Sequence, residues 1–518
     1  MNEPQSTLQS IWQLSSDHPA YPTLEANIDV DVAVVGGGIT GITTAYILAE
    51  AGKKVAVLDA NQFGRGTTGH STAKLTIQHD LIYDELLSFF GKEKASQYYQ
   101  SQNDALTFVR NLVQKEQIQC DFTDEDTFLY ATTHHGEHQL RREMKAYDKL
   151  NIPYEWVTSL PIELEIRAAL KISNQAQFHP LRYVAHLCKK LESNQAQLFE
   201  NTVCTKVTNE KDSVTVHTQD GQTVTAKVVV AATHFPFIDG GGLYMSRLKA
   251  DRSYVVAGSS DTTWPGGMYL CAEQPKRSLR GLSLNGKSYI LVGGDHHKAG
   301  QGMDARNHYD ALKEFADIQF QSFSVEQEWS AQDLTTLDNI PYIGPLSTFE
   351  PRVLTATGFE KWGMTGGVCA AQLLSDLIID GNSSYSELYH PMRFHADPSI
   401  RHFIKENVNV AKHLIQGKLN HKVEDVNELD HGQGAVVKHN GKKAGAFKDN
   451  DGNVHLVDTT CTHLGCECNW NHADLTWDCP CHGSRFSYTG DVIEGPAKKA
   501  LKKLNTVSPR AHSFFFAK

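Results

Sequence analysis

Two short boxes of cysteine and histidine near the C-terminal end constrain this chain more than any other feature. The first reads Cys-Thr-His-Leu-Gly-Cys at 461–466, and the second reads Cys-Pro-Cys-His-Gly-Ser at 479–484. Each box brings a thiol and an imidazole within three residues of each other. Two thiolates can hold one iron of a two-iron cluster while two imidazoles hold the other. A tetrahedral zinc ion is the competing interpretation, because the same ligand types suit zinc.

The pattern of the two boxes favours the cluster, and it resembles the signature of Rieske iron–sulfur domains. Zinc fingers rarely add a second cysteine to each box, whereas both boxes have one here. The resemblance covers about residues 426–518. It implies a [2Fe-2S] cluster with Cys461, His463, Cys479 and His482 as its ligands. Imidazole is neutral where thiolate is negative, so this ligand set raises the reduction potential.

The resemblance is to the Rieske subtype of the respiratory and photosynthetic cytochrome bc complexes. In that subtype the second cysteines of the two boxes form a disulfide, which implies a bond between Cys466 and Cys481 here. A pair of free thiols is the alternative, and a reducing compartment would favour it. Ser484 matches a serine of the subtype that donates a hydrogen bond to a cluster sulfide.

Two residues near the boxes differ from what the subtype would lead one to expect. Phe486 stands where the subtype has a tyrosine whose hydroxyl bonds a ligand thiolate. Hydrogen-bond donors to cluster sulfurs stabilise the reduced state, so the potential is expected below the top of the Rieske range. Cys468 has no role in the subtype, and we expect it to be a surface thiol.

A glycine-rich loop near the N-terminal end indicates dinucleotide binding. It follows a predicted strand at 30–35 and opens a helix, and a second strand at 54–58 ends at Asp59. Glycines in this pattern let the backbone approach a pyrophosphate at the helix start, and the acidic residue binds ribose hydroxyls. The three glycines of the pattern are Gly36, Gly38 and Gly41.

Further segments, in their order, resemble the D-amino-acid-oxidase-like (DAO) family of flavoenzymes across about residues 10–395. They lie at 65–71, 228–233, 341–345 and 358–365. The resemblance implies FAD as the dinucleotide. A non-covalent contact of His70 with the flavin is expected, with covalent attachment as the alternative. Besides the glycine loop and Asp59, the residues implied to lie along FAD are Thr67, Thr68, His70, Ala232, Gly363, Met364 and Thr365.

These patterns predict three parts in the chain. An α/β FAD-binding domain of the Rossmann type, with an α+β substrate domain, is expected over 1–395. A polar, helix-prone linker is expected at 396–425, and a small all-β Rieske domain at 426–518. A helix is predicted from about 366 to 380, and Asp295-His296-His297 is expected to form a plain turn.

Charge and hydropathy exclude some classes of partner. Lys plus Arg number 49 and Asp plus Glu number 60, which gives a formal net charge of −11. An acidic chain offers no broad surface for nucleic-acid phosphates. No segment is apolar and long enough for a membrane span, and the N-terminus has no signal-peptide pattern, so a cytoplasmic location is expected.

Together the motifs predict an FAD-dependent dehydrogenase. A small amine or amino acid is expected to be oxidised at the flavin, and electrons are expected to leave singly through the cluster. An acidic carrier such as a ferredoxin or flavodoxin is a candidate acceptor, because the basic residues Lys498, Lys499, Lys502 and Lys503 follow the second box. Two alternatives stay open: a reductase fed through the cluster, and a non-catalytic redox sensor. The catalytic residues and the oligomeric state are not predicted.

Overall fold

The computed structural model describes residues 9–302, 304–393, 399, 402–403, 406–410, 413 and 425–505. The chain divides into two compact units, one ending at Asn409 and the other beginning at Val410. Each unit is described by itself. Much of the predicted linker at 396–425 lies outside the described residues. Within it, however, Glu406 and Asn409 bond to the Lys298 ammonium of the first unit at 2.5 and 2.8 Å.

A six-stranded, mainly parallel sheet forms the centre of the first unit, and its strand order is β18-β19-β12-β2-β3-β8. The strands β2 and β3 are buried along their whole length, as expected for a parallel sheet covered on both faces. Only β18 runs antiparallel to its neighbour. The strands are β2 (Val32–Val35), β3 (Val55–Leu58), β8 (Gln197–Phe199), β12 (Val228–Ala231), β18 (Tyr342–Pro345) and β19 (Val353–Thr357).

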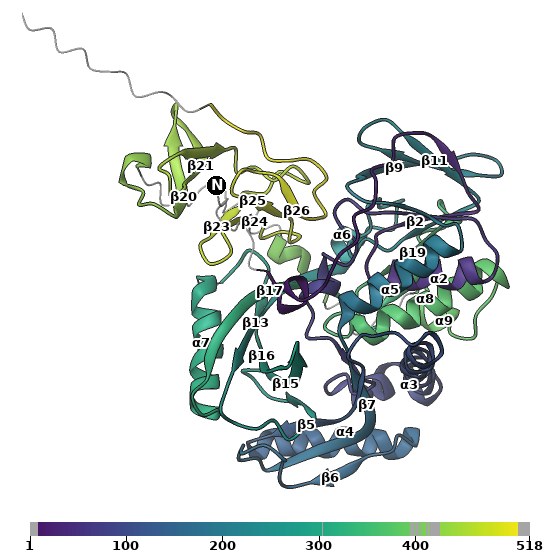
Figure 1. The fold of residues 1–518 in the computed structure, drawn as a ribbon, viewed down its shortest axis with the longest axis vertical. Helices are drawn as coiled ribbons and strands as arrows, with labels where there is room; N and C mark the ends of the chain where they lie inside the picture. The colour runs from purple at the N-terminus through teal and green to yellow at the C-terminus, as the bar shows by residue number, and fades with distance from the viewer. Residues whose placement is uncertain are drawn as a thin grey trace, which may run out of the picture. The chain divides into compact units, whose positions relative to one another are not determined.

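Helices cover this sheet, and two of them pack closely. In Figure 1, α2 (Ile39–Glu50) and α8 (Gly363–Ile379) lie side by side, and α5 (Pro180–Ser193) also packs on α2. A Cβ added at Gly367 of α8 would lie 2.6 Å from the Thr40 hydroxyl, so this close packing requires glycine. The sequence predicted a helix start near 366, and the structure starts α8 three residues earlier.

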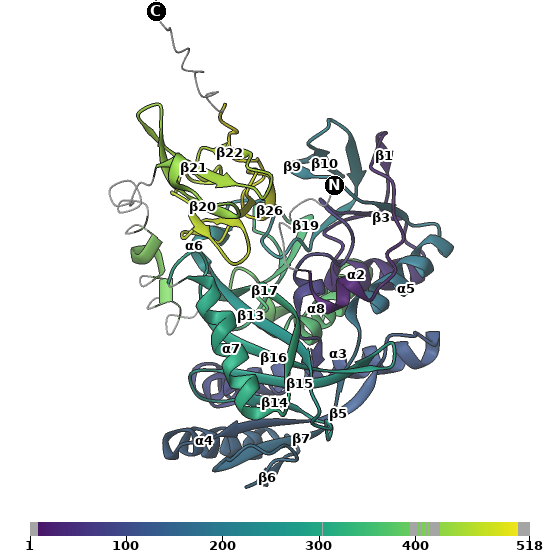
Figure 2. The ribbon, with the colours of Figure 1, turned by 60° about the vertical axis from the view of Figure 1, so that its left-hand side comes forward.

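A second, nine-stranded sheet belongs to the same unit, in the part of the chain where the α+β substrate domain is predicted. Its main path runs β17-β13-β16-β15-β14-β5-β7-β4, with β6 beside β7. Helix α7 (Ala305–Gln319) lies on β13 and β16, as Figure 2 shows. The strands are β4 (Lys74–Leu75), β5 (Thr123–Ala131), β6 (Glu155–Val157), β7 (Ala168–Gln177), β13 (Leu248–Ser259), β14 (Met268–Cys271), β15 (Arg277–Leu284), β16 (Lys287–Lys298) and β17 (Ser324–Thr336).

The rest of the first unit consists of a small sheet and several helices. Helix α3 (Ile82–Glu116) packs on α4 (His134–Leu150) and on α8. The small sheet has the order β1-β11-β10-β9. Its strands are β1 (Ile28–Asp29), β9 (Cys204–Asn209), β10 (Val214–Thr218) and β11 (Thr223–Ala226). The helices are α1 (Ile11–Leu14), η1 (Thr67–His70), α3 (Ile82–Glu116), α4 (His134–Leu150), α6 (Tyr244–Arg247) and α9 (Ser386–Tyr389).

The second unit is a small β domain, as predicted. It contains a three-stranded antiparallel sheet, β20-β21-β22, and a four-stranded antiparallel sheet, β23-β24-β25-β26. Trp477 in β24 is fully buried. The elements are η2 (Val426–Glu428), β20 (Gln433–His439), β21 (Lys442–Lys448), β22 (Val454–Val457), β23 (Asn469–Asn471), β24 (Thr476–Asp478), β25 (Arg485–Ser487) and β26 (Val492–Glu494).

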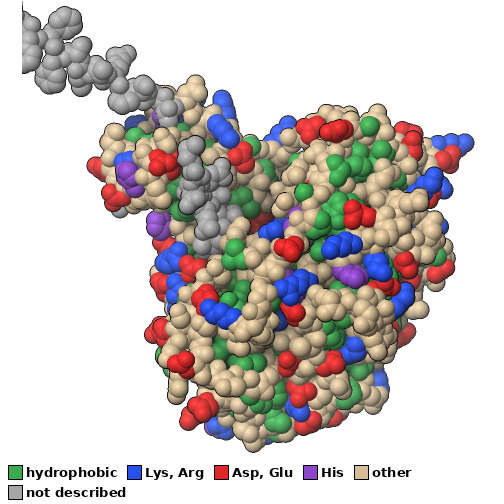
Figure 3. Space-filling view, viewed as in Figure 1, with side chains coloured by type: hydrophobic (Ala, Val, Ile, Leu, Met, Phe, Trp, Pro, Cys, Tyr) green, Lys and Arg blue, Asp and Glu red, His purple; other side chains and the backbone are tan. Residues whose placement is uncertain are grey.

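The surface carries charges of both signs. On the face drawn in Figure 3, Lys and Arg side chains are interspersed with Asp and Glu side chains. Within the described residues, no helix combines the length and the apolar character that a membrane crossing needs.

Candidate functional site

The glycine loop forms a tight cradle between β2 and α2. Gly36 has φ +108°, and a Cβ there would lie 2.4 Å from the Ala232 carbonyl oxygen at the end of β12. A Cβ at Gly41 would lie 1.9 Å from the Gly36 carbonyl oxygen. The backbone therefore folds back on itself at the start of α2, where amide groups face an approaching anion. This cradle fits the pyrophosphate of a dinucleotide.

Two side chains near the cradle hold it in shape. The Asp59 carboxylate, directly after β3, accepts hydrogen bonds from the amides of Gly37 at 2.6 Å and Asn61 at 2.8 Å. Burial raises the pKa of Asp59. The Thr68 hydroxyl accepts a hydrogen bond from the Ile39 amide at 3.0 Å. The predicted ribose-binding carboxylate therefore lies at the loop, beside the start of α2.

The segment around His70 is held by hydrogen bonds from distant parts of the chain. The Trp329 indole donates to the His70 carbonyl at 2.8 Å, and the Trp12 indole donates to the Ser71 carbonyl at 2.7 Å. Nδ1 of His70 donates to the Gly66 carbonyl at 2.8 Å. Nδ1 is therefore the nitrogen that bonds the backbone, and Nε2 is the other nitrogen of the ring. The non-covalent contact of His70 with the flavin stays a prediction, with covalent attachment as the alternative.

The start of α8 is tied to Thr76, which directly follows β4 of the nine-stranded sheet. The Thr365 hydroxyl bonds both the amide and the carbonyl of Thr76, each at 3.0 Å. Trp362 stacks on His79, with ring centroids 4.7 Å apart. Met364 and Thr365 are both buried. The predicted flavin contacts Gly363, Met364 and Thr365 thus form one rigid helix start, and their contact with FAD stays a prediction.

A group of ionisable side chains, which the sequence did not reveal, surrounds the residues just before α8. The Lys361 ammonium lies 3.0 Å from the Asp333 carboxylate, and Ser253 donates to the same carboxylate at 2.6 Å. The Glu360 amide donates to the Leu334 carbonyl of β17 at 2.8 Å, which fixes this segment to the second sheet. We call Ser253, Asp333, Glu360 and Lys361 the mixed-charge cluster.

Burial and neighbouring charges shift the pKa values in the mixed-charge cluster. Burial raises the pKa of Glu360 to about 7, and nearby Lys361 only partly opposes this. Burial disfavours the charge on Lys361, but Asp333 outweighs it and the pKa of Lys361 is raised. Burial also lowers the pKa of His296 to about 4, with Lys361 contributing. Groups with such shifts often gather at functional sites.

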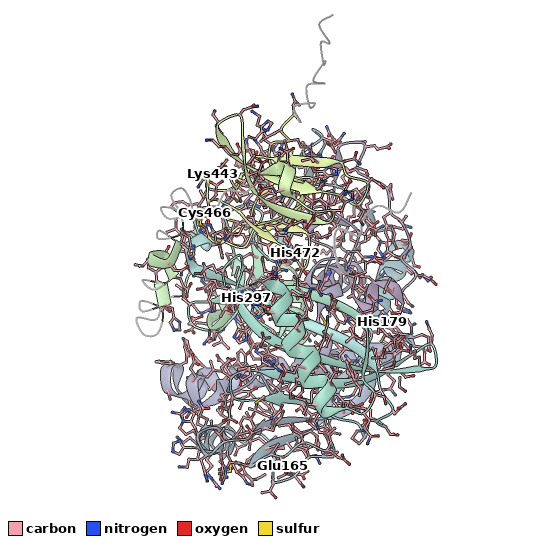
Figure 4. All side chains as sticks on the ribbon, turned by 90° about the vertical axis from the view of Figure 1, so that its left-hand side faces the viewer. Glu165, His179, His297, Lys443, Cys466 and His472 are labelled. Atoms are coloured by element: carbon pink, nitrogen blue, oxygen red, sulfur yellow. A yellow bond between two sulfur atoms is a disulfide. The ribbon has the colours of Figure 1, made fainter. Side chains whose placement is uncertain are left out.

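The expectation of a plain turn at Asp295-His296-His297 is wrong. These residues belong to the end of β16, where Asp295 bonds Arg277 at 3.1 Å and Nδ1 of His308 at 2.6 Å. His297 lies beside α7 (Figure 4), and its ring stacks on His308 at 4.4 Å. These contacts join the second sheet to α7, so we assign them a structural role.

The two cysteine–histidine boxes meet in the second unit. The Sγ atoms of Cys461 and Cys479 lie within 4.8 Å of each other, and both residues are buried. A metal–thiolate bond is about 2.3 Å long, so two thiolates on one ion lie at most about 4.6 Å apart, and the observed upper bound is close to that separation. The rings of His463 and His482 lie 5.1 Å apart and almost perpendicular. This arrangement fits a cluster with two thiolates on one side and two imidazoles on the other.

Local hydrogen bonds shape both cluster loops. The Cys461 amide donates to the Cys466 carbonyl at 2.8 Å, and the Cys479 amide donates to the Ser484 carbonyl at 2.8 Å. Cys466 and Cys481 form a disulfide in the structure, as the resemblance implied. Each loop is thereby closed on itself and joined to the other. Cys466, labelled in Figure 4, marks this linkage.

A buried ion pair stabilises the second cluster loop, which contains the box at 479–484. Arg485, directly after the box, bonds Asp478 at 2.9 Å and Asp474 at 2.8 Å. All three side chains are buried. Breaking a buried pair leaves an uncompensated charge, so this contact fixes the loop firmly.

The expectation that Cys468 is a surface thiol is wrong. Cys468 has 0% exposure, and its Sγ lies within 4.8 Å of the Sγ atoms of Cys461 and Cys479. The Ser484 hydroxyl is also buried, and it accepts a hydrogen bond from the Ala497 amide at 3.0 Å. A third sulfur and a hydroxyl therefore lie around the predicted ligands.

Phe486 is fully buried in β25, opposite Trp477. Its ring has no donor, so Phe486→Tyr is expected to raise the reduction potential by adding a hydroxyl near the cluster loops. The equilibrium constant for reduction should rise roughly tenfold, or about 59 mV for one electron. Potentiometric titration of the cluster measures this. Phe447→Tyr in β21 adds the same hydroxyl outside both boxes and should leave the potential unchanged. An unchanged or lower potential in Phe486→Tyr, with the cluster intact, would contradict this expectation.

Comparison with known proteins supports both halves of the site. The profile described as FAD dependent oxidoreductase (DAO) matches residues 31–377, and that of the Rieske [2Fe-2S] domain matches residues 420–505. YhfW of Bacillus subtilis (strain 168), which is named as a Rieske 2Fe-2S iron-sulfur protein, is 43% identical over 497 residues. That alignment covers 96% of this chain and 97% of YhfW.

Two more distant relatives match the first unit. Gamma-glutamylputrescine oxidoreductase of Escherichia coli (strain K12) is 24% identical over 383 residues, covering 70% of this chain and 87% of that protein. Glycine oxidase from Geobacillus kaustophilus has a similar fold, with a TM-score of 0.61 and 19% identity over 71% of this chain and 99% of that chain. The chain therefore belongs to the family of FAD-dependent oxidoreductases, and it carries a Rieske [2Fe-2S] domain after its flavin domain.

Proposed function

We propose that this enzyme is a dehydrogenase that oxidises a C–N bond of a small amine or amino acid and passes electrons singly through its cluster to an external acceptor. One observation carries the proposal: a flavin domain and a one-electron centre share a single chain. FAD supplies a two-electron acceptor, and the Rieske cluster supplies a one-electron carrier. An oxidase that used oxygen alone would have no need of the second unit.

The residues of the chain assign separate tasks to the two sites. The glycine cradle and Asp59 would hold the dinucleotide, and the residues at the start of α8 would contact it. Cys461 and Cys479 would hold one iron, and His463 and His482 would hold the other. The disulfide between the loops keeps these four ligands in place.

The mixed-charge cluster supports the choice of substrate class. An amino group is complementary to Asp333 and Glu360, and a carboxylate is complementary to Lys361. Two relatives are named for glycine and gamma-glutamylputrescine, both of which carry such groups. A site with both signs of charge just before α8 suits this class better than a neutral or uniformly charged substrate.

Anaerobic addition of candidate substrates tests the proposal. Amines and amino acids are mixed one by one with the oxidised holoenzyme, and the flavin absorbance is followed. At least one member of this class should bleach the flavin. If none does, while a reduced carrier reduces flavin through the cluster, the reductase alternative replaces the proposal. Flavin inert to both kinds of donor would favour the redox sensor.

Glu360 is the proposed proton acceptor for the substrate ammonium, because only the neutral amine readily gives up a hydride. With its pKa raised to about 7, Glu360 is mostly protonated below that pH and ionised above it. The rate of flavin reduction should therefore rise as pH increases through about 7. Glu360→Gln should remove this rise and lower the rate roughly 10²–10⁴-fold at high pH.

A matched control separates this role from a general effect of lost charge. Glu165 is exposed on the loop before β7 (Figure 4), and Glu165→Gln makes the same chemical change there. This variant should keep the parent pH profile. A rise through pH 7 that persists in Glu360→Gln would remove Glu360 from the proton transfer.

The electron acceptor is proposed to be an acidic carrier such as a ferredoxin or flavodoxin. Lys498, Lys499 and Lys502 are exposed after the second box. Lys503 is also exposed, but its ammonium lies 3.3 Å from Asp491, which partly neutralises it. Clustered positive charge steers acidic partners and raises their association rate.

A further inference from the structure

Three thiol sulfurs, not two, meet at the cluster loops. The Sγ atoms of Cys461, Cys468 and Cys479 all lie within 4.8 Å of one another. Their residues are 2%, 0% and 1% exposed. Cys461 and Cys479 belong to the boxes, whereas Cys468 lies outside both. Its position therefore needs a separate explanation.

The backbone fixes Cys468 from two sides. Its amide donates to the Thr459 carbonyl at 2.9 Å, which ties it to the start of the first loop. The next residue, Asn469, begins β23 and pairs with Asp478, the last residue of β24. Antiparallel pairing at that point brings Cys468 opposite Cys479, which directly follows Asp478. The thiol is thus held beside the ligand positions by strand register and by a loop hydrogen bond.

The ligand set is complete without Cys468. Two thiolates and two imidazoles satisfy a Rieske cluster. The iron that Cys468 could reach would already have its two protein ligands, so Cys468 is a thiol beside the ligands and not a third ligand. An S–H group is a weak donor, and thiolates are acceptors. The sulfur atoms of Cys461 and Cys479 are acceptors close to the buried S–H group of Cys468.

We propose that Cys468 donates an S–H hydrogen bond to the ligand thiolates and thereby raises the reduction potential of the cluster. A donor withdraws negative charge from the thiolate, so it stabilises the cluster more after an electron has been added. Phe486 has no donor of its own, and Cys468, the residue before β23, supplies one instead. Cys468 is a positioning residue, since it acts through the ligands.

The inference rests on the proposed ligand set and is independent of the direction of electron flow. The test therefore uses no amine substrate. Holoenzyme is reduced chemically in a potentiometric titration, and the cluster is followed by its circular dichroism and its magnetic resonance spectrum. Iron and acid-labile sulfide are measured on the same samples. A failure of amine oxidation would leave this measurement unaffected.

The reduction potentials of three variants are compared with that of the parent. Cys468→Ala removes the donor and should lower the equilibrium constant for cluster reduction roughly three- to tenfold, with iron and sulfide retained. Cys468→Ser keeps a donor and should fall between Cys468→Ala and the parent, or match the parent. Cys204→Ala removes a buried free thiol of the flavin unit and should leave the potential unchanged.

Two results for potential or cluster content, and one spectroscopic result, would overturn the proposal. One is a Cys468→Ala enzyme with an intact cluster and the parent potential, because a donor cannot be lost without effect. The other is loss of iron and sulfide in both Cys468 variants, which would make Cys468 a ligand or a structural support. A changed magnetic spectrum with unchanged iron content in Cys468→Ala would also indicate ligation rather than hydrogen bonding.

Discussion

Gly41→Ala is expected to yield a protein that has lost most of its flavin. The new methyl group would lie 1.9 Å from the Gly36 carbonyl oxygen, which is a backbone atom and cannot rotate away. Either α2 or the glycine loop must move, and the amides of the cradle then lose their alignment. Overpacking of this kind costs about 1–3 kcal/mol, so FAD binding should weaken roughly tenfold to a hundredfold. Flavin absorbance per protein after gel filtration measures the loss.

The control lies at the other end of the same helix. Gly52 has φ +76°, and a Cβ there would meet nothing within 4 Å. Gly52→Ala therefore costs only the strain of the left-handed backbone, about 1 kcal/mol, and should retain flavin. Full flavin content in Gly41→Ala would mean that the cradle is not the pyrophosphate site.

His482→Ala is expected to remove the cluster while sparing the flavin chemistry. One iron would lose one of its two imidazoles, and iron and labile sulfide should fall to background. Turnover with one-electron acceptors should drop at least roughly a hundredfold. Mutation of residues that only contact metal ligands already lowers metal affinity or activity by up to about that factor. Flavin reduction by the substrate should persist, because the first unit alone contains the glycine cradle and the mixed-charge cluster.

The matched control for His482→Ala is His472→Ala. His472 is exposed in the turn between β23 and β24 of the same unit (Figure 4). This variant should keep its iron, its sulfide and its turnover. If His482→Ala turned over with one-electron acceptors as fast as the parent, the cluster would not be the electron exit, and the sensor function would gain support.

Local patterns predicted the parts of the fold that depend on neighbouring residues. The strand–glycine–helix unit at 30–48 and the two cysteine–histidine boxes are each contained in a short stretch of sequence, so a dinucleotide site and a cluster site could be inferred locally. The choice of FAD rested on the resemblance of further segments to a flavoenzyme family. The small all-β domain was equally visible in its short strands and turns. The comparisons confirm the two families that these patterns indicated.

Contacts between distant residues could not be read from the sequence. The ion pair of Lys361 with Asp333 joins the segment before α8 to β17, which comes earlier in the chain. The sequence indicated the Gly358–Thr365 segment as functional but did not indicate its partner in β17. The sequence predicts a surface thiol at Cys468, because its burial depends on the register of β23 with β24. The predicted start of α8 near 366 is three residues late, because a glycine such as Gly363 lowers helix propensity and obscures the first turn.

The central claim is that electrons from an amine reach the cluster by way of the flavin domain. Stopped-flow absorbance measures this directly when oxidised holoenzyme is mixed without oxygen with a substrate found in the screen, and flavin and cluster are followed at separate wavelengths. Flavin bleaching should precede cluster reduction in the parent and in His472→Ala, and only flavin bleaching should remain in His482→Ala. A parent cluster that stays oxidised while the flavin is fully bleached would contradict electron transfer from flavin to cluster.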